Sequence, residues 1–91
     1  MSYDVRTAQR FDREFKKLDR YTQLMIGSWI NKNLVGCEDP RTHGKALVAN
    51  RRGQWRYRIG DYRLICCIDD RELIILALSV GHRREVYRNS I

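Results

Sequence analysis

The sequence predicts an α+β fold: an N-terminal strand, a two-helix hairpin, a mostly antiparallel sheet ending in three consecutive strands, and a short C-terminal helix or tail. Apolar residues recur at intervals of three and four between positions 8 and 34, which is helical spacing. Apolar and polar residues then alternate over 54–66, which is typical of a half-buried strand. The segment LIILAL at 73–78 is apolar on both faces and indicates a strand that is central or covered on both sides.

The first half of the chain contains the first strand and both helices. Residues 2–7 are a short strand candidate, and Thr7 is expected to cap the helix that follows. The segment LDRYT at 18–22 interrupts the helical spacing, so a second helix follows it and ends near Gly36. Two helices joined by so short a connection form an antiparallel hairpin.

The second half of the chain contains most of the sheet. Residues 36–53 are rich in loop-forming residues, and KALV at 45–48 is expected to form one helical turn. One domain, spanning 1–91, is expected for a chain of this length. The three consecutive strands are expected at about 54–59, 62–68 and 72–80.

The charge of the chain favours a polyanionic partner. The net charge is +7, and arginine supplies 14 of the 18 basic residues. Between Arg41 and Arg63, seven cations meet a single acidic residue, Asp61. Arginine is preferred for bidentate contacts to phosphate, so nucleic acid is the expected partner, with a generally basic soluble surface as the alternative. The chain has neither an apolar signal region nor a membrane-spanning run, so we expect a cytoplasmic protein without membrane contact.

The cysteines and histidines do not show a metal-binding pattern. Cys37, Cys66 and Cys67 are odd in number, contain no CxxC motif, and include two neighbours that would point to opposite faces of a strand. We expect all three to be reduced and structural. His43 and His82 are the only other soft ligands and lack ligand spacing, so no metal and no other cofactor is expected.

The hairpin QWRYRIGDYRL at 54–64 places like charges side by side. If Gly60 and Asp61 form the turn, Arg58 pairs with Arg63 across the two strands. Alternation then directs the apolar side chains toward the helices, and Arg56, Arg58 and Arg63 toward the other face. Like charges in such a pair, with Cβ atoms about 5 Å apart, destabilise the hairpin. Either a carboxylate such as that of Asp61 neutralises them, or this face is a receptor for one or two phosphates.

The last strand is expected to bring a histidine to the arginines. Because this strand runs antiparallel to its neighbour, residues 80–83 should approach Arg58 and Arg63. His82 is then either an ordinary surface histidine or a member of a functional cluster.

Three segments together resemble the RelE branch of the RelE/ParE toxin superfamily: WRYRIGDYRL at 55–64, the apolar strand at 73–78, and SVGHRREVY at 79–87. The resemblance extends over nearly the whole chain. It implies a small basic ribonuclease that enters the A site of the 70S ribosome and cuts mRNA during translation. It also implies neutralisation by a RelB-like antitoxin, and binding to operator DNA only through the toxin–antitoxin complex.

The resemblance also suggests roles for single residues. Arg56 and Arg58 match two basic positions on the first hairpin strand, where well-known members have lysine. Arg63 matches the arginine of the YRL element. Arg83 and Tyr87 match an arginine and a tyrosine of the C-terminal segment, although the stretch between them is shorter here than in some members. The expected catalytic residues are Arg58, Arg63, His82, Arg83 and Tyr87, and the expected RNA- or phosphate-binding residues are Lys45, Arg51, Arg52 and Arg56.

The suggested mechanism is attack of a ribose 2′-OH on the adjacent phosphate without a metal ion, leaving a 2′,3′-cyclic phosphate and a 5′-OH. The three hairpin arginines would bind the phosphate and stabilise the pentavalent transition state. Arg83 would face the leaving oxygen, and Tyr87 could stack on an unpaired base. Because arginine stays protonated and is a poor base, His82 is expected to be the general base or acid, with Tyr87 as runner-up.

Two other functions stay open at this point. A ParE-like toxin that inhibits DNA gyrase has the same fold but generally lacks the basic catalytic set. A non-catalytic module would bind RNA or the ribosome through the basic face without cutting.

Overall fold

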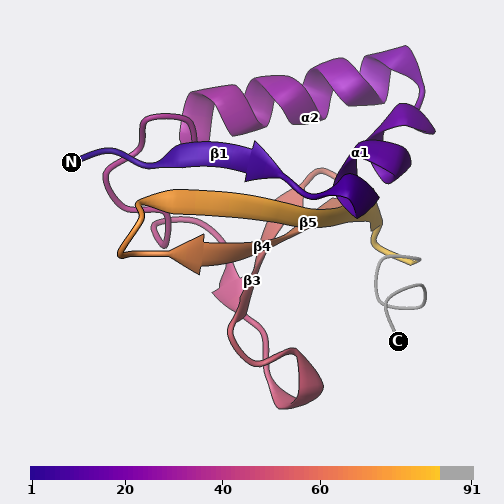
Figure 1. Cartoon of the computed structure of the whole chain (residues 1–91). Coiled ribbons are helices and arrows are strands. Elements are labelled where there is room, and N and C mark those ends of the chain that lie inside the picture. The colour runs from indigo at the N-terminus through magenta and orange to yellow at the C-terminus, as the bar shows by residue number, and fades with distance from the viewer. Residues whose placement is uncertain (85–91) are drawn as a thin grey trace.

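The computed structural model describes residues 1–84 and follows the predicted order of elements up to the last strand, with two additions (Figure 1). The predicted C-terminal helix or tail lies outside the described residues. The additions are the two-residue strand β2 and the 3₁₀ turn η1, which lies on a loop that projects away from the sheet. The elements are β1 (Asp4–Thr7), α1 (Gln9–Lys16), α2 (Arg20–Asn33), β2 (Lys45–Ala46), η1 (Ala49–Arg51), β3 (Gln54–Ile59), β4 (Tyr62–Asp69) and β5 (Ile74–His82).

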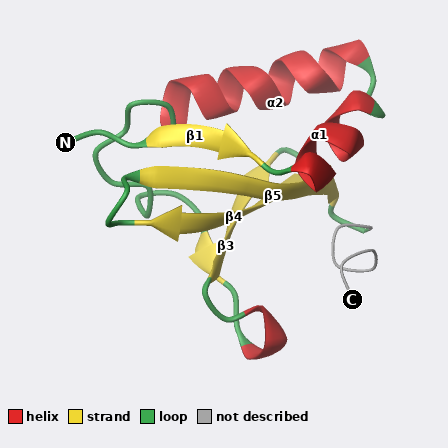
Figure 2. Cartoon of the chain, in the orientation of Figure 1, coloured by secondary structure: helices red, strands yellow, loops and turns green. Residues whose placement is uncertain are grey.

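The strands form a five-stranded sheet in the order β1-β5-β4-β3-β2 within residues 1–84. β1 is parallel to β5, and the other neighbours are antiparallel. The predicted α+β class is therefore confirmed, and the apolar last strand lies inside the sheet, between β1 and β4. Helix α2 lies across one face of the sheet, and α1 lies beside the end of β5 (Figure 2).

Helix α1 replaces β1 along the second half of β5. The ladder between the two strands ends at Thr7 and Ala77. Beyond it, one carboxylate oxygen of Glu14 accepts from the Ser79 hydroxyl at 2.8 Å and from the Val80 amide at 3.0 Å. The predicted cap at Thr7 is wrong, because Ala8 is the N-cap and has no side-chain hydrogen bond to offer. The β5 edge is thus covered by a helix instead of a strand.

Helix α2 begins at a side-chain cap. One oxygen of the Asp19 carboxylate accepts from the Thr22 amide at 3.2 Å, and the other accepts from the Thr22 hydroxyl at 2.6 Å. These hydrogen bonds lower the pKa of Asp19. The helix ends at Leu34, and Gly36 follows with a positive φ of 75°, as expected for a glycine after a helix. The interruption seen at 18–22 is therefore a capping signal.

The expected helical turn at KALV is wrong. Lys45 and Ala46 form β2 by pairing with Arg56 and Trp55, and the turn η1 begins only at Ala49. Pairing with a neighbouring strand has overridden the local helical preference.

The core lies between α2 and the sheet. Its fully buried side chains come from both layers, and they include Ile26, Leu34, Tyr57, Leu64, Cys66 and Ile75. The three cysteines are free, as predicted, and burial raises the pKa of each thiol. Across residues 1–84, no helix has the length and apolar character needed to cross a bilayer.

Candidate functional site

The β3–β4 hairpin has the predicted register. Ile59 pairs with Tyr62 across the turn, and Arg58 pairs directly with Arg63. Gly60, at the first turn position, has a positive φ of 60°, which the primed two-residue turns of β-hairpins require at that position. The like-charge pair expected from the sequence is therefore present.

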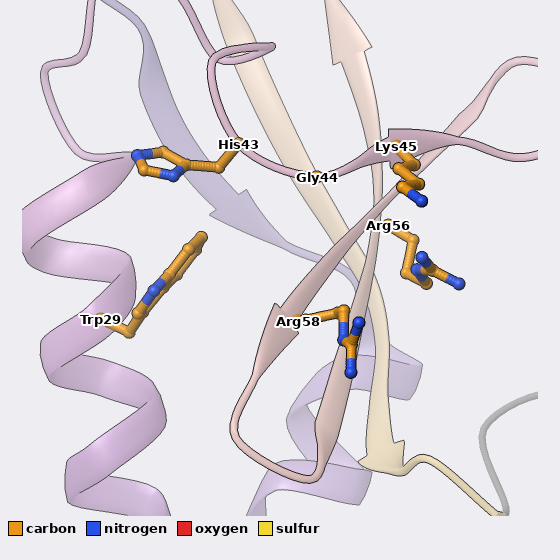
Figure 3. A pocket seen from close by; sticks show the side chains of 6 residues that line it. All are labelled: Trp29, His43, Gly44, Lys45, Arg56 and Arg58. Carbon is orange, nitrogen blue, oxygen red and sulfur yellow. The ribbon is translucent and has the colours of Figure 1, made fainter.

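Strand β2 adds a second like-charge pair beside the first. Lys45 pairs directly with Arg56 on the outer edge of β3. Since paired residues share a face and alternate residues of a strand share a face, Lys45 and Arg56 lie on the same side as Arg58 and Arg63. Figure 3 shows the side chains of Lys45, Arg56 and Arg58 on one side of the β2–β3 ladder. We call Lys45, Arg56, Arg58 and Arg63 the cationic row.

The members of the cationic row differ in how they are compensated. Arg58 is exposed and, among residues 1–84, has no carboxylate within 4.0 Å, so Asp61 does not neutralise it. Arg63 is only 9% exposed, and its Nη1 donates to the carbonyl oxygen of Tyr62 at 3.2 Å and of Gly60 at 3.5 Å. Arg63 thus lies on the predicted face of the hairpin but is buried there, and its side chain folds back onto the turn.

The expectation that the His82 ring meets the arginines is wrong. Gly81 pairs with Arg63, whereas His82 pairs with Tyr62 and its ring packs edge-on against the Tyr62 ring at 5.6 Å. His82 therefore lies on the face opposite the cationic row. Its Nδ1 accepts from the Arg84 amide at 3.2 Å, which holds the ring away from Arg63.

A cavity of about 240 Å³ adjoins the cationic row at the outer edge of β3. Figure 3 shows Trp29, from α2, and His43, from the loop between α2 and β2, on one side of β3, with the basic side chains on the other. The two rings meet edge-to-face at 5.7 Å and 69°. Neither Trp29 nor His43 was predicted as a site residue, because Trp29 falls within the apolar spacing of a helix and His43 lacks ligand spacing. The lining residues are Trp29, His43, Gly44, Lys45, Arg56 and Arg58.

The loop that forms this cavity is fixed to β3 at two points. The Tyr57 hydroxyl donates to the Pro40 carbonyl at 2.6 Å, and the indole N–H of Trp55 donates to the His43 carbonyl at 2.8 Å. Burial raises the pKa of Tyr57, so this phenol keeps its proton. Directly after the second of these points, Gly44 has a φ of 86° and passes so close to β3 that a Cβ there would lie 2.3 Å from the Arg56 carbonyl oxygen. This loop is therefore held in place, and glycine is required at position 44.

The other predicted site residues lie around the cationic row without joining its pairs. Arg51 donates to the Gln54 side chain at 3.3 Å and lines a separate cavity on the same face. Arg52 is exposed after η1. The Arg83 amide donates to the Asp61 carbonyl at 2.8 Å, which places Arg83 beside the hairpin turn. Tyr87 lies outside the described residues.

Comparison with known proteins identifies the family. The family described as "ParE toxin of type II toxin-antitoxin system, parDE" matches residues 5–87. The chain belongs to the RelE/ParE toxin superfamily. Toxin RelG of Mycobacterium tuberculosis is 31% identical over 88 residues, which are 97% of this chain and 99% of that protein. The protein is thus a RelE-like toxin of a type II toxin–antitoxin system.

Solved structures agree with this assignment. A chain from the Mycobacterium tuberculosis RelBE2 toxin–antitoxin complex superposes with a TM-score of 0.83 and 28% identity, over 93% of this chain and 95% of that one. The isolated Escherichia coli RelE toxin superposes with a TM-score of 0.72, over 98% of this chain and 95% of that one. At 22% identity, the second comparison supports the fold alone.

Proposed function

We propose that this toxin is a ribosome-dependent endoribonuclease that cuts translated mRNA in the ribosomal A site. The main supporting observation is the cationic row, with its two directly opposed like-charge pairs, Lys45–Arg56 and Arg58–Arg63. Such pairs destabilise a sheet. A bound phosphate would turn this repulsion into attraction, so an RNA backbone is the ligand that explains the arrangement best.

The cationic row is suited to cleavage by the ribose 2′-OH. In this reaction the 2′ oxygen attacks the adjacent phosphorus, the 5′ oxygen leaves, and negative charge grows on the phosphate. Arg58, with Lys45 and Arg56 beside it, would bind the phosphate and stabilise that charge. Arg63, held by the turn carbonyls, would present its charge from a fixed position. Arg83, beside the turn, would face the leaving oxygen.

Proton transfer requires a group other than arginine, because guanidinium stays protonated in proteins. His82 is on the opposite face of the sheet and is not assigned this role. The runner-up from the sequence, Tyr87, is therefore the residue that we propose for proton transfer, and it could stack on an unpaired base as well.

A RelB-like antitoxin is the partner that we propose for this toxin. The similar Mycobacterium tuberculosis chain comes from a RelBE2 toxin–antitoxin complex, and other similar chains come from RelB–RelE complexes. We further propose that the toxin contacts the 70S ribosome and mRNA directly, and operator DNA only through the antitoxin complex. The net charge of +7 favours both an acidic partner and RNA.

The proposal is tested by mapping RNA ends in a purified translation system with a defined mRNA. We expect cuts phased with codons, each leaving a 2′,3′-cyclic phosphate and a 5′-OH, and no cuts when ribosomes are omitted. Equal cutting of free mRNA would refute ribosome dependence, and uncut mRNA would refute the nuclease assignment.

A second candidate, inhibition of DNA gyrase, is favoured by the match to the family described as ParE toxin. The cationic row speaks against it, since ParE-like toxins resemble this chain in fold but generally lack the basic set. The same purified toxin added to gyrase and relaxed plasmid discriminates between the two. Loss of supercoiling without mRNA cleavage would favour the ParE-like activity.

A further inference from the structure

The cavity beside the cationic row contains two aromatic rings that phosphate binding does not explain. Trp29 packs on the buried ring of Tyr57 at 5.4 Å, so one side of its indole belongs to the core. Trp29 also contacts the ring of His43, whose side chain is exposed and whose ring lies at 69° to the indole. His43 therefore contributes little to the core, yet its position is fixed.

The fixed position of His43 comes from its backbone. Trp55 holds the His43 carbonyl, and Gly44 must approach β3 closely for that hydrogen bond to form. The next residue, Lys45, begins β2 and enters the cationic row. One short segment, 43–45, thus brings an aromatic ring and a phosphate-binding cation to the same cavity.

The cavity lies at an edge of the sheet that a single-stranded chain can reach. β2 pairs with only Trp55 and Arg56, so no strand among residues 1–84 covers the outer edge of residues 57–59. The cavity connects the aromatic side of this edge with the basic side (Figure 3). A ligand with a flat apolar part and an anionic part, joined by a short spacer, matches these two sides.

We propose that this cavity binds one unpaired base of the RNA, in the corner between Trp29 and His43, while Lys45, Arg56 and Arg58 bind a phosphate of the same strand. This inference rests on the proposed function and names how the substrate is recognised. Two rings nearly at right angles offer one face for stacking and one for an edge contact. Bases in a duplex are stacked on each other, so the cavity selects single-stranded RNA. An acidic peptide would satisfy the cations and leave the aromatic corner without a role.

The test is binding of short 2′-O-methyl oligonucleotides, which cannot be cleaved by 2′-OH attack. One trinucleotide has all three bases, and three others each lack one base. We expect the wild-type protein to bind the complete trinucleotide more tightly than one of the abasic ones. Stacking contributes about 1–3 kcal/mol per base, so His43→Ala should weaken binding of the complete trinucleotide by about tenfold. The same variant should bind that abasic trinucleotide as the wild type does.

His82→Ala is the matched control, since it removes the same kind of ring from the end of β5, where the ring packs against Tyr62 and does not line this cavity. It should bind every oligonucleotide like the wild type, and thermal unfolding should show that both variants remain folded. The inference is overturned if the wild type does not distinguish complete from abasic oligonucleotides, or if His43→Ala weakens both equally. It is also overturned if His43→Ala affects only antitoxin binding. None of these outcomes removes the proposed nuclease activity, which is measured separately from RNA ends.

Discussion

Arginines lie at both ends of the β3–β4 hairpin, but Arg41 at one end is paired with a carboxylate, whereas Arg58 at the other has none within 4.0 Å among residues 1–84. At the turn, Arg58 faces Arg63. At the far end, Arg41 donates to both oxygens of Asp70, at 3.0 and 3.1 Å, and its guanidinium lies 5.8 Å from the centre of the Trp55 ring. Tyr3 donates to the same carboxylate at 2.7 Å.

The difference separates a structural arginine from one that we propose to bind a ligand. Arg41 joins the loop at 34–44 to the turn after β4, and Tyr3 adds the start of β1 to the same network. Arg58 makes no such connection within residues 1–84. A bidentate pair stabilises the fold modestly, whereas an uncompensated cation beside another cation gains its partner only when an anion binds.

The largest expected effect is on activity, from Arg58→Ala. Loss of one group that stabilises transition-state charge costs about 100-fold in rate, so mRNA cleavage in the translation system should fall by about that factor. Unfolding in urea should show equal or slightly greater stability, because the like-charge pair is removed. Arg41→Ala is the control and should show the reverse, with cleavage kept and stability lowered. If both variants lose cleavage equally, the two ends do not differ in function.

A smaller effect, on the free energy of unfolding, is expected from a substitution at Gly44, in the loop before β2. In Gly44→Ala, the new Cβ would lie 2.3 Å from the Arg56 carbonyl oxygen and 2.6 Å from the Trp55 indole nitrogen. We expect the free energy of unfolding to fall by about 2–4 kcal/mol, because strain from the positive φ and a backbone clash add together. Gly53→Ala is the matched control, since Gly53 has a φ of 94° and open space around its Cβ position. It should lose only about 1 kcal/mol. Equal losses would show that close packing at Gly44 is unimportant.

The smallest expected effect is a pH dependence at the far end. Hydrogen bonds from Arg41, and then from Tyr3, lower the pKa of Asp70. A depressed folded-state pKa adds stability at pH values above the unfolded-state value, about 3.9, and this stability is lost as the pH falls through the folded-state pKa. Asp70→Asn should therefore be less stable than the wild type at neutral pH, with the two curves converging in acid. A difference that is independent of pH would assign the effect to packing instead of charge.

The hairpin could be predicted from the sequence because its determinants are local. A two-residue turn at Gly60-Asp61 fixes the register of β3 and β4, and alternation then fixes the face of each side chain. The opposition of Arg58 and Arg63 follows from these two facts alone. Helix α2 was predicted for a similar reason, since its apolar spacing and its terminal Gly36 are adjacent in the chain.

The face of His82 could not be predicted, because a single residue decides it. β5 contains a bulge, so that Cys66 pairs with Ala77 but Ile65 pairs with Ser79. Without this extra residue, Val80 would pair with Arg63 and His82 would lie on the same face as the arginines. The bulge shifts the register by one position, which moves every later side chain of β5 to the opposite face.

The sequence by itself determined the α+β class, the hairpin register and the Arg58–Arg63 pair, because a turn and a period of two act over neighbouring residues. Only the tertiary structure decided that Lys45 pairs with Arg56, that Arg63 folds back onto its turn, and that His43 meets Trp29. Each of these contacts depends on how a loop returns to a sheet edge. That return is governed by long-range hydrogen bonds, such as those from Tyr57 to Pro40 and from Trp55 to His43, and no local pattern encodes them.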